Sequence, residues 1–185
     1  MNHTLSLIAS RRSHRAYLPQ QITREQLQAL LNAALQSPSA VNRQPWHFTA
    51  VQNAALLDEI NQAVRENVMK KDPSLRSPRF EDEAFHVFYH APTVIFIAGD
   101  PQNRWAELDC GIAVQNIALA AESMGLGSVI LGMPREAFQT EKAPAFRKAL
   151  FFPEGWDYVI GIAIGHPCDD KDAHPVQENK VCIVE

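Results

Sequence analysis

The feature that most restricts the fold is a long helical segment, residues 105–125, that has almost no polar face. Its sequence is WAELDCGIAVQNIALAAESMG, which puts apolar or small side chains on nearly every side of a helix. A helix that is apolar all round must be buried, because such a surface is costly to expose to water. The segment therefore predicts a helix that lies either at the centre of the fold or against another subunit.

The remaining segments predict an irregular series of helices and strands around one sheet. Thr23 and Gln26 form a capping-box pattern that begins a helix, and Pro38 ends it. The run APTVIFIAGD is nearly continuous in apolar residues, which is typical of a strand buried on both faces of a sheet. The other expected elements are helices over residues 4–10, 54–69 and from Pro134 onward, divided at Pro144, and strands over residues 47–52, 128–131 and 157–165.

These elements indicate one α+β domain over residues 1–185, with no internal repeat and no linker between two domains. Residues 70–85 are polar, contain two prolines and lack periodicity. We expect them to be a long excursion that is mobile or covers a site.

Composition excludes several classes of protein. The net charge of −4 does not favour general binding of nucleic acid. No run approaches the roughly 20 apolar residues of a membrane span, and the N-terminus does not resemble a secretory signal. Cys110, Cys168 and Cys182 are scattered and odd in number, so we expect reduced thiols in a cytoplasmic protein, with Cys110 as inert packing.

The densest positive cluster is the run RRSHR at residues 11–15. Arginine forks match phosphate oxygens and a serine hydroxyl adds a short donor, so the cluster is a candidate phosphate site. The alternative is a solvated basic face at the end of a helix.

The second polar cluster is SPSAVNRQPWHF, residues 37–48, between a helix and a strand. Its hydroxyls and amides suit a polar, flat ligand, while the alternative is a proline-punctuated turn with Trp46 in the core. Taken together, the two clusters are more specific than either alone.

RRSHRAY, a capped helix and then SPSAVNRQPWHF resemble the FMN-dependent nitroreductase family, whose N-terminal third has an RRS-x-R motif followed by SPS-x-x-N-x-QPW-x-F. GIAVQNIALAAESMGLGSVILG resembles the long dimer helix and GLGS strand of that family, and IGIAIGHP resembles its last strand. The resemblance covers nearly the whole chain. It implies a central, mostly antiparallel sheet flanked by helices, in an intertwined homodimer with FMN sites at the subunit interface.

The resemblance also implies the roles of particular residues. The first motif would hold the FMN phosphate and ribityl chain, the second would reach the flavin ring from the partner subunit, and the strand after GLGS would pass the other side of the ring. In that order, the predicted residues are Arg11, Arg12, Ser13 and Arg15, then Pro38, Ser39, Asn42 and Gln44, then Ile130, Leu131 and Gly132.

The C-terminal tail departs from the family pattern. Many members have a Lys-Pro-Arg-like motif that closes over the phosphate, whereas this chain has DAHPVQENKV. His174 is the candidate donor at this place, and Lys180 is a second basic group that could approach the phosphate.

The implied activity is transfer of hydride from NADH or NADPH, through N5 of FMN, to a nitroaromatic or quinone-like small molecule in a ping-pong cycle. We name no catalytic side chain, because the cofactor performs the redox step and the protein positions it. Two alternatives remain: a flavin-dependent dehydrogenase of an unknown metabolite, and a non-catalytic flavin-binding redox sensor.

Three weaker patterns are left. His86 and His90 would share one face of a helix, as in some zinc sites, but no further ligand has suitable spacing. GLGS is more typical of a helix end that enters a strand than of a phosphate loop. Glu107 and Asp109 either pair with arginines across a dimer or form a solvated edge.

Overall fold

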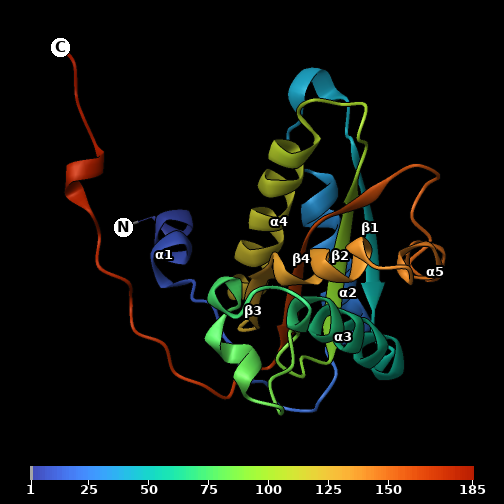
Figure 1. The fold of residues 1–185 in the computed structure, drawn as a ribbon. Coiled ribbons are helices and arrows are strands. Elements are labelled where there is room, and N and C mark those ends of the chain that lie inside the picture. Colours follow the sequence, from blue (N-terminus) through green and yellow to red (C-terminus); the bar gives the residue numbers. More distant parts are fainter. Residues whose placement is uncertain (1) are drawn as a thin grey trace.

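Four antiparallel strands form one sheet at the centre of the fold (Figure 1). The computed structural model describes residues 2–185. The strands lie in the order β1-β2-β4-β3 and are β1 (Trp46–Val51), β2 (Thr93–Gly99), β3 (Gly127–Leu131) and β4 (Asp157–Gly165). Each neighbouring pair is antiparallel, so the predicted α+β fold with a mostly antiparallel sheet is confirmed.

Helices cover both faces of the sheet because its central strands are apolar on both sides. The helices are α1 (His3–Ser10), α2 (Arg24–Leu35), α3 (Ala54–Met69), α4 (Ala106–Ser123) and α5 (Ala143–Ala149). Ile95 and Ile97 of β2 are buried in the layer that contains α2 and α4. Val94 and Phe96 are buried in the opposite layer with α3 and α5. As predicted, β2 is buried on both faces.

Helix α4 is buried on the side that faces the sheet and keeps an apolar stripe on its other side. Cys110, Ile117 and Ala121 are fully buried. On the opposite side, Leu108 is 58% exposed, and Leu119 is partly exposed. The helix stops before Gly125, whose φ of +68° suits the left-handed residue after a helix end.

The prediction of a helix from Pro134 onward is wrong for the first half of that segment. Residues Met133–Gln139 form a 3-10 helix, and α5 begins only at Ala143. Thr140 separates the two, because its hydroxyl donates to the Ala137 carbonyl at 2.7 Å and accepts from the Lys142 N–H at 3.2 Å. These local bonds replace those that a continuous helix would make. Pro144 sits in the first turn of α5, where its missing N–H costs nothing.

The polar excursion at residues 70–85 contains two short 3-10 helices, Pro73–Leu75 and Pro78–Glu81. Phe80 anchors it in the core with 4% exposure. Arg76 fixes its start, because the guanidinium donates to the carbonyls of Lys71 at 2.8 Å and Met69 at 2.7 Å.

The C-terminal residues leave the body of the molecule as an extended arm (Figure 1). The exposed fractions of Val176, Ile183 and Val184 are 81%, 80% and 92%. Within residues 2–185, none of the helices has the length and apolar character needed to cross a membrane.

Candidate functional site

The Arg-rich segment (residues 11–15) runs from the end of α1 to the beginning of β3. Ser13 forms a parallel bridge with Ser128, and the His14 N–H donates to the Ser128 carbonyl at 3.0 Å. Gly127 permits this close approach, since a Cβ there would lie 3.0 Å from the Cβ of His14 and 2.7 Å from that of Pro167. The segment is therefore attached to the same strand that leads to Ile130.

The guanidinium group of Arg12 is only partly hydrogen-bonded within the described residues. Its Nη1 donates to the carbonyls of Ala9 at 2.6 Å and Arg11 at 3.0 Å. Its Nε is buried and has no hydrogen-bond partner in the part of the chain that the structure describes. A buried charged donor without an acceptor is costly, so the hydrogen bonding of this guanidinium is incomplete within the described residues.

Asp169 fixes the far side of the Arg-rich segment. Its carboxylate accepts from His14 Nδ1 at 2.7 Å and from the Arg15 backbone N–H at 2.9 Å, and Lys171 lies 3.4 Å away. Burial raises the pKa of this carboxyl, but the hydrogen bonds from Arg15, His14 and Lys171 outweigh it and hold the pKa below its ordinary value. Asp169 is therefore charged at neutral pH and positions the main chain of Arg15.

The polar loop (residues 37–44) is strained and internally bonded. Val41, Asn42 and Gln44 have φ values of +54°, +53° and +47°, a region that residues other than glycine rarely adopt. The Ser39 hydroxyl accepts from the Gln44 N–H at 2.9 Å, and Gln44 Nε2 donates to Asn42 Oδ1 at 3.0 Å. Ser39, Asn42 and Gln44 thus lie together, and backbone strain of this kind concentrates at functional sites.

Asp109, in the first turn of α4, holds this loop in place. Asp109 is 2% exposed, and each of its carboxylate oxygens accepts a hydrogen bond from the Ala40 N–H at 3.2 Å. Farther along α4, Asn116 donates to the Ser37 hydroxyl at 2.8 Å. Asp109 is therefore buried and positions the polar loop through hydrogen bonds within its own chain. It does not belong to a solvated edge of the helix. Glu107 also pairs within the chain, with Arg135 at 3.2 Å.

The Arg-rich segment and the polar loop lie at opposite ends of α4 (Figure 1). Asp109 binds the loop at the start of the helix, whereas the Arg-rich segment pairs with Ser128, beyond its end. The 15 residues from Asp109 to Met124 span roughly 20 Å at 1.5 Å per residue. One copy of the chain therefore does not bring the two predicted halves of the site together.

The end of β3 offers backbone and one apolar side chain. Ile130 is 36% exposed, Leu131 is 2% exposed and points into the core, and Gly132 is exposed. The Leu131 carbonyl accepts from the hydroxyl of buried Tyr158. Burial raises the pKa of Tyr158 well above its ordinary value, so this donor stays protonated. The side chain of Leu131 is thus unavailable to a ligand, while its neighbours are accessible.

Comparison with known proteins decides the family. A family model described as Nitroreductase family matches residues 8–166, a range that contains the Arg-rich segment, the polar loop and the end of β3. The chain belongs to the nitroreductase family.

Solved members of the nitroreductase family share the fold over the full length of the chain. A nitroreductase with bound FMN from Desulfitobacterium hafniense DCB-2 has a TM-score of 0.95 at 35% identity, and one from Bacteroides fragilis has 0.92 at 32%; in both cases all of each chain is covered. A relative from Archaeoglobus fulgidus is 33% identical over 179 residues, 96% of this chain and 93% of the relative. It carries the provisional name NADH dehydrogenase/NAD(P)H nitroreductase.

His174 lies outside the range that the nitroreductase family model matches. It is exposed on the C-terminal arm, as is Lys180. Within the described residues, no hydrogen bond or ion pair joins either side chain to the Arg-rich segment.

His86 and His90 do not share a helical face, because residues 85–90 form turns in which His90 has a φ of +53°. The rings lie 4.5 Å apart. His86 Nδ1 accepts from the Phe88 N–H at 3.2 Å, and its Nε2 lies 3.2 Å from Asp58. Burial, with a contribution from His90, lowers the pKa of His86 despite Asp58. Across the described residues, no group of three or more His, Cys, Asp or Glu side chains is arranged to hold a metal ion.

Cys110 is inert packing, as predicted. It is fully buried, and burial, assisted by Asp109 and Glu107, raises the pKa of its thiol to about 12. The thiol therefore stays protonated at neutral pH and is no nucleophile.

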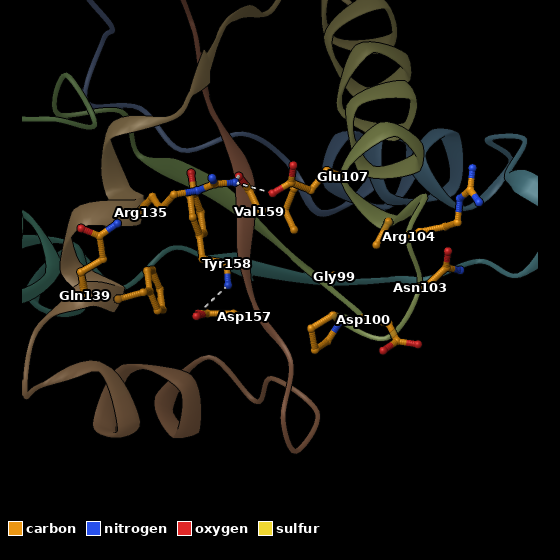
Figure 2. A pocket seen from close by; sticks show the side chains of 13 residues that line it. Gly99, Asp100, Asn103, Arg104, Glu107, Arg135, Gln139, Asp157, Tyr158 and Val159 are labelled. Atoms are coloured by element: carbon orange, nitrogen blue, oxygen red, sulfur yellow. Dashed lines mark hydrogen bonds and ion pairs between the residues drawn. The ribbon is translucent and has the colours of Figure 1, made fainter.

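A hollow of about 500 Å³ lies beside the first turn of α4 (Figure 2). We call it the Arg135 hollow; it is lined by parts of residues 99–107, 135–139 and 157–159. Arg135 pairs with Glu107 across it, and Asp157 pairs with Arg147 at 2.8 Å. The charges of Arg135, Glu107 and Asp157 are therefore compensated within the chain.

Sequence reasoning missed Asp109 and Asp169 as positioning residues. An acidic residue within an almost wholly apolar helix was the available sign for Asp109. The role of Asp169 depends on a contact with His14 across 155 positions of sequence, for which the sequence offers no local pattern.

Replacing Asp169 with Asn should weaken the dependence of the free energy of unfolding on pH in the acidic range. Because the folded-state pKa of Asp169 is lowered, its contribution is present above the unfolded value of about 4 and is lost as pH falls through the lower folded value. We expect the gap in the free energy of urea unfolding between the wild type and Asp169→Asn to be constant above about pH 6 and to shrink towards pH 3. Asp172→Asn, at an exposed position nearby, is the control; a gap that does not change with pH would contradict the role of Asp169.

Replacing Asp109 with Ala should loosen the polar loop. The Ala40 N–H loses its acceptor, which should lower the free energy of unfolding by about 1–3 kcal/mol. Hydrogen exchange of peptides that cover residues 38–45 should become faster. Glu107→Ala is the control, since its ion pair is exposed and worth less than about 1 kcal/mol; equal exchange in the two variants would contradict the anchoring role.

Proposed function

We propose that the protein is an NAD(P)H-dependent FMN oxidoreductase that passes electrons to a nitroaromatic or quinone-like acceptor in a ping-pong cycle. When bound, FMN would accept hydride at N5 from NADH or NADPH and pass electrons to the acceptor after the nicotinamide has left. Membership of the nitroreductase family, with FMN bound in two solved relatives, supports this function. The observation that carries it is the buried Nε of Arg12, a cationic donor that has no hydrogen-bond partner within the described residues.

The Arg-rich segment fits the phosphate of FMN. Arg11, Arg12 and Arg15 bring three guanidinium groups to one short stretch, and Ser13 adds a hydroxyl beside β3. Guanidinium forks bind phosphate oxygens with charge-assisted hydrogen bonds, and their charge does not depend on pH in the neutral range. Asp169 positions this segment through the main chain of Arg15 without occupying its guanidinium.

The polar loop fits the edge of the flavin ring. Its hydroxyl and amides, on Ser39, Asn42 and Gln44, are neutral groups that both donate and accept, as the carbonyl and imide edge of the ring requires. Pro38 at the loop and Ile130 at the end of β3 supply apolar contact, and Gly132 leaves backbone accessible. No side chain of the protein acts as a general acid or base in this reaction. The chain binds, orients and shields the cofactor.

We further propose that the complete site forms between two copies of the chain, because the two halves lie at opposite ends of α4. Three regions support this homodimer with exposed apolar surface. They are the stripe on α4 that contains Leu108, the whole of α1, which has no buried residue, and the C-terminal arm. Covering such surface is worth about 25 cal/mol per Å². The position of His174 relative to the FMN phosphate would depend on where the C-terminal arm packs on the partner subunit.

The purified protein should be yellow and should release FMN rather than FAD on denaturation. The Arg11→Ala/Arg15→Ala variant should bind FMN at least about tenfold more weakly, since each change removes a charge-assisted contact. Anaerobic NADH or NADPH should bleach the wild-type flavin absorbance. Arg24→Ala, an exposed position at the start of α2, is the matched control for lost charge. A colourless protein that ignores added FMN, or unchanged affinity in the double variant, would refute the proposal.

Mixing two defective variants should restore flavin sites if each site is shared between two chains. Arg11→Ala/Arg15→Ala keeps an intact polar loop, and Asn42→Ala/Gln44→Ala keeps an intact Arg-rich segment. Refolding them together should give about a quarter of the sites in intact form, because half of the randomly paired dimers are mixed and each holds one intact site. FMN binding that stays as weak as in either variant alone would show that one chain builds the whole site.

A further inference from the structure

A second hollow, of about 510 Å³, lies between the polar loop and the turn that leads into α4. We call it the Arg43 hollow; it is lined by Ala40, Val41 and Arg43 from the loop and by Asp100, Gln102, Asn103, Arg104 and Trp105 from the turn. None of these side chains is part of the FMN site proposed above.

The Arg43 hollow carries positive charge that the chain does not neutralise. Within the described residues, neither Arg43 nor Arg104 takes part in an ion pair. The one carboxylate in the lining, Asp100, caps its own turn by accepting from the Gln102 N–H at 2.9 Å. Arg104 lies in the lining of both hollows, and Figure 2 shows its side chain extending away from Arg135. Two guanidinium groups are thus free for an anion.

A flat apolar surface lies beside these charges. Trp105 is 42% exposed, and the Arg104 guanidinium lies 4.4 Å from its ring centroid. The Asn103 side-chain oxygen accepts from the backbone N–H of Trp105 at 2.9 Å, which leaves the amide NH₂ of Asn103 as a donor. An aromatic face, amide groups and two arginines are the groups that recognise an adenine ring joined to phosphates.

The Arg135 hollow differs in this respect. Apart from Arg104, which it shares with the Arg43 hollow, its guanidinium group belongs to Arg135 and is paired with Glu107, and the carboxylate of Asp157 is paired with Arg147. An anion entering it would have to compete with carboxylates that already hold these positions. The unpaired charge therefore favours the Arg43 hollow.

We propose that the Arg43 hollow binds the adenosine diphosphate half of NADH or NADPH, with Arg43 and Arg104 on the phosphates and Trp105 against the adenine. This inference rests on the proposed function, because the polar loop that we assign to the flavin ring also supplies Arg43. If the nicotinamide lies on a flavin ring held at this loop, the phosphates of the dinucleotide would extend past the edge of the ring toward the residues of the loop. Arg43 is adjacent in sequence to Asn42 and separates it from Gln44, so it is suitably placed to receive them.

The test uses the FMN-loaded protein and its Arg43→Gln/Arg104→Gln variant. Anaerobic stopped-flow reduction with NADPH and NADH measures the dissociation constant and the limiting rate of flavin reduction separately. We expect the dissociation constants to rise about tenfold or more, because two charge-assisted contacts are lost, while the limiting rate stays unchanged. Reduced nicotinamide mononucleotide lacks the adenosine half, so its dissociation constant should be the same in both proteins.

A binding measurement without reduction gives a second readout. Calorimetric titration with ADP and with 2′-phospho-ADP should show binding to the wild type and a loss of about tenfold or more in the variant. The control is Arg24→Gln/Lys148→Gln, which removes two exposed positive charges elsewhere and should match the wild type.

The outcomes separate the two proposals. Equal dissociation constants in the variant and the control would refute the Arg43 hollow as the adenosine site, as would loss of FMN from the variant, which would assign these arginines to the flavin. A wild-type protein that holds FMN but is reduced by none of the three donors would refute the proposed function. In that case the ADP titration still decides whether the hollow binds an adenine nucleotide.

Discussion

The burial of α4 against the sheet determines the position of everything else in the proposed site. Its inner side, with Cys110, Ile117 and Ala121, packs on the isoleucines of β2 and β4, so the helix cannot shift without opening the core. Its first turn carries Asp109, which holds the polar loop. Its end leads through Gly125 to β3, where Ser128 holds the Arg-rich segment. This tightly packed helix therefore keeps the two proposed binding segments at a fixed separation.

Both binding segments are held in the same physical way, by a carboxylate that accepts from a backbone N–H. Asp109 accepts from Ala40, and Asp169 accepts from Arg15. In each case the anchor binds the main chain and leaves the polar side chains of the segment available to a ligand. For the polar loop this matters most, because Val41, Asn42 and Gln44 occupy backbone conformations that each cost of the order of 1–3 kcal/mol and persist only where the surroundings impose them.

The sequence predicts those parts of the structure that depend on neighbours along the chain. The capping box of Thr23 and Gln26, the helix over Ala54–Met69 and the doubly buried strand β2 follow from local patterns, and the structure confirms them. The 3-10 helix at Met133–Gln139 was missed, because the side-chain bonds of Thr140 that separate it from α5 have no periodic pattern.

Local sequence patterns could not predict the two carboxylates that hold the segments of the candidate site. Asp109 and Ala40 are 69 positions apart, and Asp169 and His14 are 155 apart. The motifs predict the segments at residues 11–15 and 38–44 as binding segments, because the types of side chain indicate what each segment can bind; these roles stay predictions. What they could not show is that one chain keeps the segments apart, since that follows from the length and burial of α4.

The surfaces left exposed on one copy belong to the elements that carry the two halves of the proposed site. The stripe with Leu108 is on the helix that holds the polar loop, and α1, which has no buried residue, runs directly into the Arg-rich segment. If two copies cover these surfaces, the same contact that buries apolar area also brings a guanidinium cluster to a polar loop. Association of the chains and binding of the cofactor are then linked, and each must strengthen the other by the same free energy. The buried Nε of Arg12, which has no hydrogen-bond partner within the described residues, is consistent with this linkage.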